Sequence, residues 1–327
     1  MEPSQDPSQS DLPVLVVEAD EAGLRLDGFL ARRKIVPSVA AARRALAAGI
    51  VAVNGRSASK GTHVQTGDVV ALGDEPASDV ILKPSPELEL TVLYLDDEIV
   101  AVDKPAGIAS HPIRPCEGAT VASGLIARFP ECAGASPDPR EGGLGHRLDV
   151  STSGVLLAAR SREAWYRLHE ALATPFCEKI YFAETRGDFP AAANIEHASV
   201  EFVVPGGQPS SFVITVPIGR QGRRGHKVKL ASGRQPLAAR TEITLVESRP
   251  GAALVEARLS RGRAHQVRAH LAYLGIPVIG DAVYGQVDQD ANMDLHLHAW
   301  AVSFVHPTTG KPLRIEAPLP TWARRLF

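Results

Sequence analysis

The sequence has few cysteines, no long apolar run and almost no net charge. Its three cysteines, Cys116, Cys132 and Cys177, are widely spaced and odd in number, which argues against a disulfide framework and against a paired metal-binding motif. No apolar segment approaches the roughly 20 residues of a membrane-spanning helix, and the polar, acidic start MEPSQDPSQSD lacks the pattern of a signal peptide. We therefore expect a cytoplasmic protein with reduced thiols and no membrane partner.

A net charge of −2 gives the protein no overall attraction to a polyanion. The charges are unevenly distributed, however. Twelve lysines or arginines and only three acidic residues lie between Thr215 and His270, whereas many acidic residues lie in the N-terminal tail and between Glu87 and Asp103. A local positive face is therefore available.

With 327 residues and 44% hydrophobic content, the chain is long enough for a small and a large domain. Residues 1–22 are rich in Pro, Ser, Gln and acidic residues, and they predict a disordered tail. Residues 23–73 have the pattern of a small domain. Residues 74–86 are rich in Pro, Ser and acidic residues and predict a linker, so the large domain spans residues 87–327.

The small domain has the pattern of an α+β module. Leu26 and Leu30 have helical spacing, Ser38 is a suitable N-cap for a second helix, and Asn54-Gly55 indicates a hairpin turn. Through RLDGFLARR, GIVAVNG and TGDVVAL the segment resembles the alpha-L RNA-binding domain of a small-subunit ribosomal protein. A solvated basic helix on an accessory domain is the alternative. Under the resemblance, the basic residues on or beside the two helices are expected to bind RNA, namely Arg32, Arg33, Lys34, Arg43 and Arg44.

Short apolar runs in the large domain predict strands that often follow one another directly. Three segments, 120–129, 161–173 and 264–274, have helical patterns instead. Because strands outnumber helices, we expect an α+β fold with a mixed, largely antiparallel sheet and flanking helices. The predicted strands are 99–102, 155–159, 180–183, 212–216, 243–246 and 254–259.

Two polar segments are candidates for chemistry. GHRLDVSTSG, at 145–154, places Asp149 in a loop just before a buried strand, where it could act as nucleophile, base or metal ligand, or merely cap the loop. RGRAHQVRAH, at 261–270, opens a predicted helix with Arg268 at the edge of its buried stripe. An arginine there needs a carboxylate partner. A salt-bridged surface arginine is the alternative.

Together these segments resemble the RluA-type pseudouridine synthase family, over about residues 87–321. The signature is HRLDVSTSG at 146–154. Support comes from DKPAGIASHP at 103–112, KIYFAETRG at 179–187, PIGR at 217–220, GRAHQVRAHLAYLGIPVIGD at 262–281 and LHAWAVSFVHPTTGKPL at 297–313.

The resemblance implies an enzyme that isomerises uridine to pseudouridine in structured RNA without a cofactor or metal. It implies that Asp149 is the nucleophile, that Arg147 helps take the place of a flipped-out uridine, and that Tyr181 packs against the target base. It also implies that Arg268 pairs with the catalytic carboxylate, which we expect through two of its nitrogens. Two further residues of this helix segment are expected to contact RNA, Arg263 and His265.

The chemistry agrees with this implication. Breaking the C–N glycosidic bond leaves the sugar C1′ electron-poor, and a carboxylate is suited to attack or stabilise that centre. A stacked base cannot reach such a pocket, so the nucleotide must be flipped out, and Tyr181 offers an aromatic surface for it. A glycosidase acting on small sugars would need a second carboxylic acid near Asp149, and the sequence offers no obvious one.

In the family, members with the N-terminal module mostly modify large-subunit ribosomal RNA, which makes this RNA the expected partner of a monomeric enzyme. A transfer RNA pseudouridine synthase is one alternative. A catalytically silent RNA-binding or ribosome-assembly factor is another, and the intact Asp149, Tyr181 and Arg268 argue against it.

Overall fold

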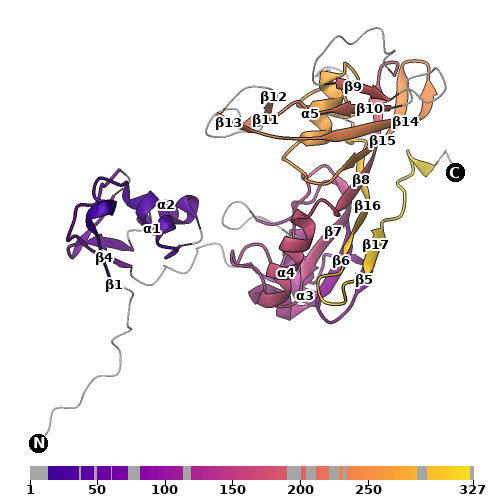
Figure 1. The fold of residues 1–327 in the computed structure, drawn as a ribbon. Coiled ribbons are helices and arrows are strands. Elements are labelled where there is room, and N and C mark those ends of the chain that lie inside the picture. The colour runs from indigo at the N-terminus through magenta and orange to yellow at the C-terminus, as the bar shows by residue number, and fades with distance from the viewer. Residues whose placement is uncertain are drawn as a thin grey trace, which may run out of the picture. The chain divides into compact units, whose positions relative to one another are not determined.

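The computed structural model describes eleven segments of the chain in two compact units, Met1–Ile81 and Leu82–Phe327, shown in Figure 1. No helix in these segments is long and apolar enough to span a membrane. Nor do three or more His, Cys, Asp or Glu side chains gather in them as a metal site would require. The described residues are 14–36, 38–47, 50–59, 61–72, 82–112, 119–189, 200–203, 211–220, 228–230, 234–285 and 293–324.

The N-terminal unit is an antiparallel sheet of order β1-β4-β2-β3 with two short helices. Apolar side chains of the helices, among them Phe29 and Leu30, are fully buried in one core with Val51 and Val70 of the sheet. Its elements are β1 (Val14–Val16), a 3-10 turn (Ala19–Glu21), α1 (Leu26–Arg32), α2 (Val39–Ala47), β2 (Val51–Val53), β3 (Arg56–Ser57) and β4 (Val69–Leu72).

Both predicted boundaries of this unit need correction. Residues 14–22 are not a disordered tail, because β1 pairs with β4 and Val17 is buried. A three-residue strand needs little burial of its own when a neighbouring strand supplies the hydrogen bonds, so the mainly polar composition of residues 1–22 as a whole concealed it. At the other boundary, residues 82–86 of the predicted linker belong to the second unit, where the Ser85 N–H donates to the Ser123 carbonyl. Residues 73–81 lie outside the described segments.

The second unit is built on a ten-stranded sheet of order β5-β6-β7-β16-β8-β15-β14-β10-β9, with β17 paired to β16. Among the described strands, only β7 and β16 pair in parallel, so the expected mixed, largely antiparallel sheet is confirmed. The strands are β5 (Thr91–Leu95), β6 (Ile99–Lys104), β7 (Ser153–Ala159), β8 (Glu178–Arg186), β9 (Val200–Val203), β10 (Ser211–Ile214), β14 (Thr241–Arg249), β15 (Ala252–Leu259), β16 (Leu297–Val305) and β17 (Pro312–Glu316).

At one end of this sheet, apolar residues point to both faces. On β6, Val100 and Val102 pack toward helix α3 (Val121–Arg128), whereas Ile99 and Ala101 pack in the core that contains α4 (Arg162–Ala173). Strands with both faces covered have continuous apolar sequences, which explains why IVAV and VLLAA lack alternation. The loop before β7 is thereby attached to a buried strand.

Helix α5 (Gln266–Tyr273) covers the other end of the sheet, as Figure 1 shows, and Val267 and Leu271 pack on β10, β14 and β15. The helix begins two residues later than predicted, because His265 has a left-handed backbone conformation, with φ of 56°. Beside α5 lies a small sheet of β11 (Ile218–Arg220), β12 (Val228–Leu230) and β13 (Arg234–Leu237).

Candidate active site

The loop that carries Asp149 is held firmly on its N-terminal side. The Leu148 N–H donates to Ser110 Oγ at 3.1 Å, and the same hydroxyl donates to the Leu148 carbonyl at 2.9 Å. The Leu148 side chain is buried in the core beneath α3. Backbone and side chain of the preceding residue are therefore both fixed, which limits how far Asp149 can move.

On the C-terminal side, the loop is held by Lys104 at the end of β6. This side chain is fully buried, and its Nζ donates to the carbonyls of Val150 at 3.0 Å, Thr152 at 2.8 Å and Pro105 at 2.8 Å. Burial lowers the pKa of Lys104 to about 8, although the nearby charge of Asp149 acts in the opposite direction. The ammonium group thus replaces the water that these carbonyls would otherwise bind.

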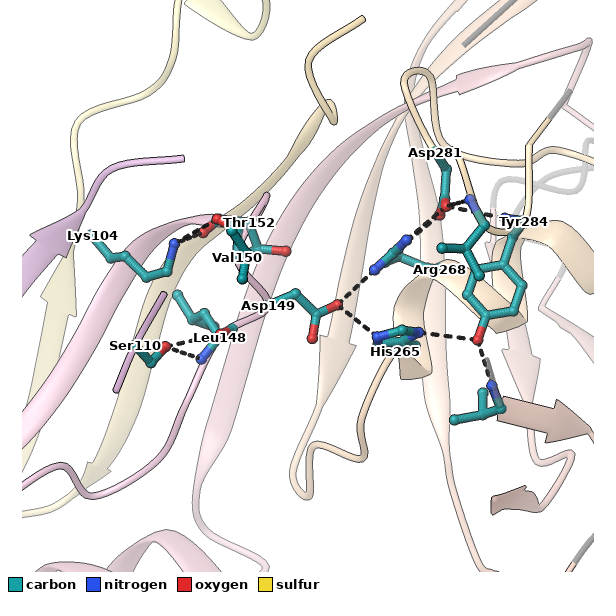
Figure 2. A network of polar contacts seen from close by, with 12 residues as sticks. Lys104, Ser110, Leu148, Asp149, Val150, Thr152, His265, Arg268, Asp281 and Tyr284 are labelled. Atoms are coloured by element: carbon teal, nitrogen blue, oxygen red, sulfur yellow. Dashed lines mark hydrogen bonds and ion pairs between the residues drawn. The ribbon is translucent and has the colours of Figure 1, made fainter. Parts of the chain in front are cut away.

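Arg268 reaches the Asp149 carboxylate from α5. Its Nη1 donates to Asp149 Oδ2 at 2.9 Å, so the predicted pairing is confirmed. The expected two-nitrogen geometry is wrong, because the other side of the guanidinium is used by Asp281: Nε and Nη2 donate to Asp281 Oδ2 and Oδ1 at 2.8 and 2.7 Å (Figure 2). One arginine therefore bridges two carboxylates.

The two carboxylates differ in environment. Asp281 has no exposed side-chain surface and also accepts the backbone N–H groups of Val283 and Tyr284, whereas Asp149 is 28% exposed. Burial is the largest single influence on the pKa of Asp281 and raises it, but the hydrogen bonds and charge of Arg268 together with the two backbone N–H groups lower this pKa overall. The pKa of Arg268 is raised in the same way, against the effect of burial, by Asp281 and Asp149. Asp281 therefore acts as the fixed counter-ion of Arg268.

His265 faces the same oxygen of the Asp149 carboxylate as Arg268 does. Its Nε2 is 3.7 Å from Asp149 Oδ2, and its Nδ1 is 3.2 Å from the hydroxyl of Tyr284. Sequence reasoning assigned His265 to RNA binding, but the ring is directed at Asp149. Its left-handed backbone is uncommon for a residue other than glycine, and such strain is concentrated at functional sites.

Tyr181 and Arg147 differ in how closely the structure associates them with Asp149. Tyr181, on β8, is partly buried and packs against the apolar cores on both sides of the site. Burial, and next the charge of Asp149, raise the pKa of its hydroxyl. Arg147 is exposed, two residues before Asp149 in the same loop. Its predicted role in replacing a flipped base stays a prediction.

The other predicted RNA-binding residues have ion-pair and hydrogen-bond partners other than Asp149 or are exposed. In the N-terminal unit, Arg32 pairs with Asp20, Arg33 with Glu18 and Glu21, and Arg43 with Asp27, while Lys34 and Arg44 are exposed. In the second unit, the Arg263 side chain donates to the Ala238 carbonyl at 3.5 Å. Their contacts with RNA stay predictions.

Sequence reasoning missed the roles of Lys104, Ser110, Asp281 and Tyr284, although the first three lie in the quoted motifs. A signal existed for Lys104, which ends the apolar strand IVAVDK, because a buried ammonium group must find oxygen partners. Asp281 gave no such signal, since its partner lies thirteen residues away on another element. His270 of α5 is buried between Thr241 and the Val216 carbonyl.

A carboxylate held in a rigid loop, backed by a buried arginine and flanked by an aromatic ring, defines an enzyme site suited to an electron-poor carbon atom. The profile of RNA pseudouridylate synthases matches residues 98–273, and that of the S4 domain matches residues 24–70. The chain belongs to the RNA pseudouridylate synthase family, with an RNA-binding S4 domain as its N-terminal unit.

Individual relatives resemble most of the chain. An uncharacterised RNA pseudouridine synthase of Mycobacterium bovis is 36% identical over 91% of this chain and 92% of its own. Ribosomal large subunit pseudouridine synthase C of Haemophilus influenzae is 32% identical over 95% and 92%. The solved structure of human RNA pseudouridylate synthase domain containing 1 has a TM-score of 0.53 and 25% identity, covering 73% of this chain and 86% of that chain.

Proposed function

We propose that this enzyme isomerises specific uridines in large-subunit ribosomal RNA in the cytoplasm, with Asp149 as its nucleophile. The observation that carries the proposal is the single carboxylate oxygen left open in a rigid site: Arg268 and His265 both face Oδ2 of Asp149. Among the described residues, Oδ1 has no hydrogen-bond or ion-pair partner. An accessible, oriented oxygen is what attack on C1′ or proton removal next to it requires.

The reaction exchanges one bond of C1′ for another. The bond from C1′ to N1 of uracil breaks, the base turns, and a bond from C1′ to C5 forms, while C5 loses a proton and N1 gains one. In this proposal the ring of Tyr181 supports the turning base, and the packing of Tyr181 against both apolar cores favours that role. Arg147 is exposed, as the proposed replacement of a flipped uridine requires.

Ribosomal RNA is the proposed substrate for two reasons. The curated relative from Haemophilus influenzae is named for the large ribosomal subunit, and this chain matches it over 95% of its length. The S4 domain adds an RNA-binding unit that the chemistry alone does not need.

The test is to delete the gene and map pseudouridine in ribosomal and transfer RNA. We expect loss at one or a few positions of large-subunit RNA, restored by the wild-type gene and not by Asp149→Asn. Loss confined to transfer RNA would reject the substrate, and restoration by Asp149→Asn would reject the nucleophile.

A further inference from the structure

The hydroxyl group of Tyr284 connects strand β12 to His265 (Figure 2). The Val228 N–H donates to Tyr284 Oη at 2.8 Å, and Oη lies 3.2 Å from His265 Nδ1. Tyr284 is held by other contacts: its backbone N–H donates to Asp281, and the Arg268 guanidinium lies over its ring, 5.5 Å from the centroid. The position of the hydroxyl is therefore set by groups other than His265.

The Val228 contact determines where the hydroxyl proton of Tyr284 goes. A backbone N–H can only donate, so Tyr284 Oη accepts from Val228 and keeps its own O–H for another acceptor. Burial raises the pKa of Tyr284, which keeps the proton on the oxygen. His265 Nδ1 lies within reach of this O–H as an acceptor, and a nitrogen that accepts the proton carries a lone pair.

In a neutral imidazole, a lone pair on Nδ1 places the proton on Nε2. This N–H is directed toward Asp149 Oδ2, 3.7 Å away. The opposite tautomer would direct a lone pair at the carboxylate, which is repulsive. The distance exceeds that of a hydrogen bond, but catalytic contacts that are long in a free enzyme tighten when the substrate binds.

We propose that Tyr284 is a positioning residue, which fixes the tautomer of His265 so that its Nε2–H and Arg268 together hold Oδ2 of Asp149. Oδ1 is then the reacting oxygen. This inference rests on the proposed function for its effect on rate, but its structural core is the tautomer of His265. It also ties the site to β12, because Val228 packs in one apolar cluster with Tyr284 and Ala269 of α5.

The tautomer is measured by nitrogen NMR of the RNA-free enzyme with labelled histidine. The resonances of His265 are those that disappear in His265→Asn. We expect Nδ1 to be unprotonated and Nε2 protonated in the wild type, with this preference weakened in Tyr284→Phe. A protonated Nδ1 in the wild type, or an unchanged spectrum in Tyr284→Phe, overturns the proposal.

Kinetics measure the consequence for the reaction. Tyr284→Phe should lower kcat on RNA roughly five- to tenfold, the effect of one hydrogen bond, with KM and melting temperature close to wild type. The matched control is Tyr94→Phe on β5. It removes a phenol that donates to Asp96 at 2.6 Å, and it should leave kcat unchanged. An unchanged kcat in Tyr284→Phe, or an equal loss in both variants, contradicts the proposal.

Two substitutions of His265 separate positioning from backbone strain. Gln places its amide nitrogen near the position of Nε2, whereas Asn reaches only that of Nδ1 but suits the left-handed backbone better. We expect His265→Gln to keep more activity than His265→Asn. Adding Tyr284→Phe to His265→Asn should cost nothing further, because both act through one contact. The reverse ranking, or additive losses, would show that backbone conformation or separate effects dominate.

These measurements also separate this inference from the proposed function. A wild-type enzyme that forms no pseudouridine in any RNA would refute the proposed function, while the NMR spectrum would still decide the tautomer. An active enzyme with the opposite tautomer would refute only the inference.

Discussion

Arginines pair with carboxylates in both units, but the buried partner differs. In the N-terminal unit, Glu21 and Asp27 are each 4% exposed, while their respective partners Arg33 and Arg43 are 31% and 54% exposed. In the second unit, Arg268 is 8% exposed and its partner Asp149 is 28% exposed. Under the proposed function, the more accessible member of each of these pairs is the one that meets RNA, a guanidinium for a phosphate in one unit and a carboxylate for a sugar carbon in the other.

The difference follows from what each pair must hold in place. A buried carboxylate that pairs with the Nε of an exposed arginine limits the motion of that side chain. The arginine then loses less conformational entropy when it contacts a phosphate. A buried arginine cannot itself meet RNA, but it fixes and stabilises the carboxylate. Asp281 completes this arrangement, because it holds Arg268 through two nitrogens and leaves the third for Asp149.

The largest effect should come from removing the accessible carboxylate. Asp149→Asn preserves shape and should lower turnover by on the order of 10⁴-fold, with RNA affinity nearly unchanged. Chromatography of nucleosides from digested product RNA measures the turnover. The matched control is Asp138→Asn, because Asp138 also pairs with an arginine, Arg140, and is 25% exposed. Substantial turnover by Asp149→Asn would mean that another group reacts with the sugar.

The next largest effect should be on stability. It shows whether removing the carboxylate partner of a buried arginine lowers the free energy of unfolding more than removing the partner of an exposed one. Asp281→Asn leaves a buried guanidinium undercompensated and should lower the free energy of unfolding by about 3 kcal/mol. Asp27→Asn should cost about 1 kcal/mol, because its exposed arginine partners can turn to water.

Fluorescence separates these two measurements, because all three tryptophans, Trp165, Trp300 and Trp322, lie in the second unit. Urea unfolding followed by fluorescence should therefore shift for Asp281→Asn and not for Asp27→Asn. Hydrogen exchange of the α1 amides should show the reverse. Equal costs for the two substitutions would remove the distinction between the units.

Lys104 sharpens the comparison as a buried cation whose hydrogen-bond partners, among the described residues, are carbonyl oxygens alone. Its pKa is about 8 in the folded protein and 10.5 in an exposed lysine. Between these values the unfolded chain binds more protons, so the contribution of Lys104 to the free energy of unfolding rises with pH, by up to about 3 kcal/mol.

Lys104→Met should lack this rise. The measurement is the difference in free energy of unfolding between wild type and variant, followed from below pH 8 to above pH 10 by urea titration. Groups common to both proteins cancel in the difference. A difference that is independent of pH would show that Lys104 keeps an ordinary pKa.

The smallest effect should come from deleting residues 1–81, which removes the first unit. KM for RNA should rise and its salt dependence should flatten, by a slope of roughly 0.7 to 0.9 for each lost phosphate contact. Turnover at saturating RNA should stay the same, because Asp149 and its partners lie in the second unit. A folded variant without turnover would assign the S4 domain a part in the chemistry.

Local sequence predicted the elements that bury apolar runs, and it predicted that Arg268 needs a carboxylate partner, which the family resemblance identified as Asp149. The first follows from strand length and flanking residues, and the second from the cost of an unpaired guanidinium at a buried face. Both arguments concern the environment that a residue requires, either burial or a partner of opposite charge. The neighbouring residues in the sequence are enough to infer that requirement.

Local sequence did not predict which partner a side chain would take when several suitable groups were available. Asp281 and Asp149 both suit Arg268, and only the fold decides that Asp281 takes two of its nitrogens. His265 was predicted to contact RNA, and not Asp149, because a left-handed residue before a helix is not visible in the sequence. The strand at residues 14–16 escaped for a similar reason, since its partner β4 begins at Val69.

The parallel pairing of β7 with β16 has a consequence for how the protein is made. Strand β7 follows the Asp149 loop, and at Ser153 and Gly154 it pairs with His298 and Ala299. A contact across so long a loop forms slowly and late, and a ribosome adds His298 and Ala299 roughly 15 to 60 s after the first residue. Residues 14–72 complete their sheet within the earliest part of synthesis. The N-terminal unit can therefore complete its fold during synthesis before the strand that follows the Asp149 loop gains its parallel partner.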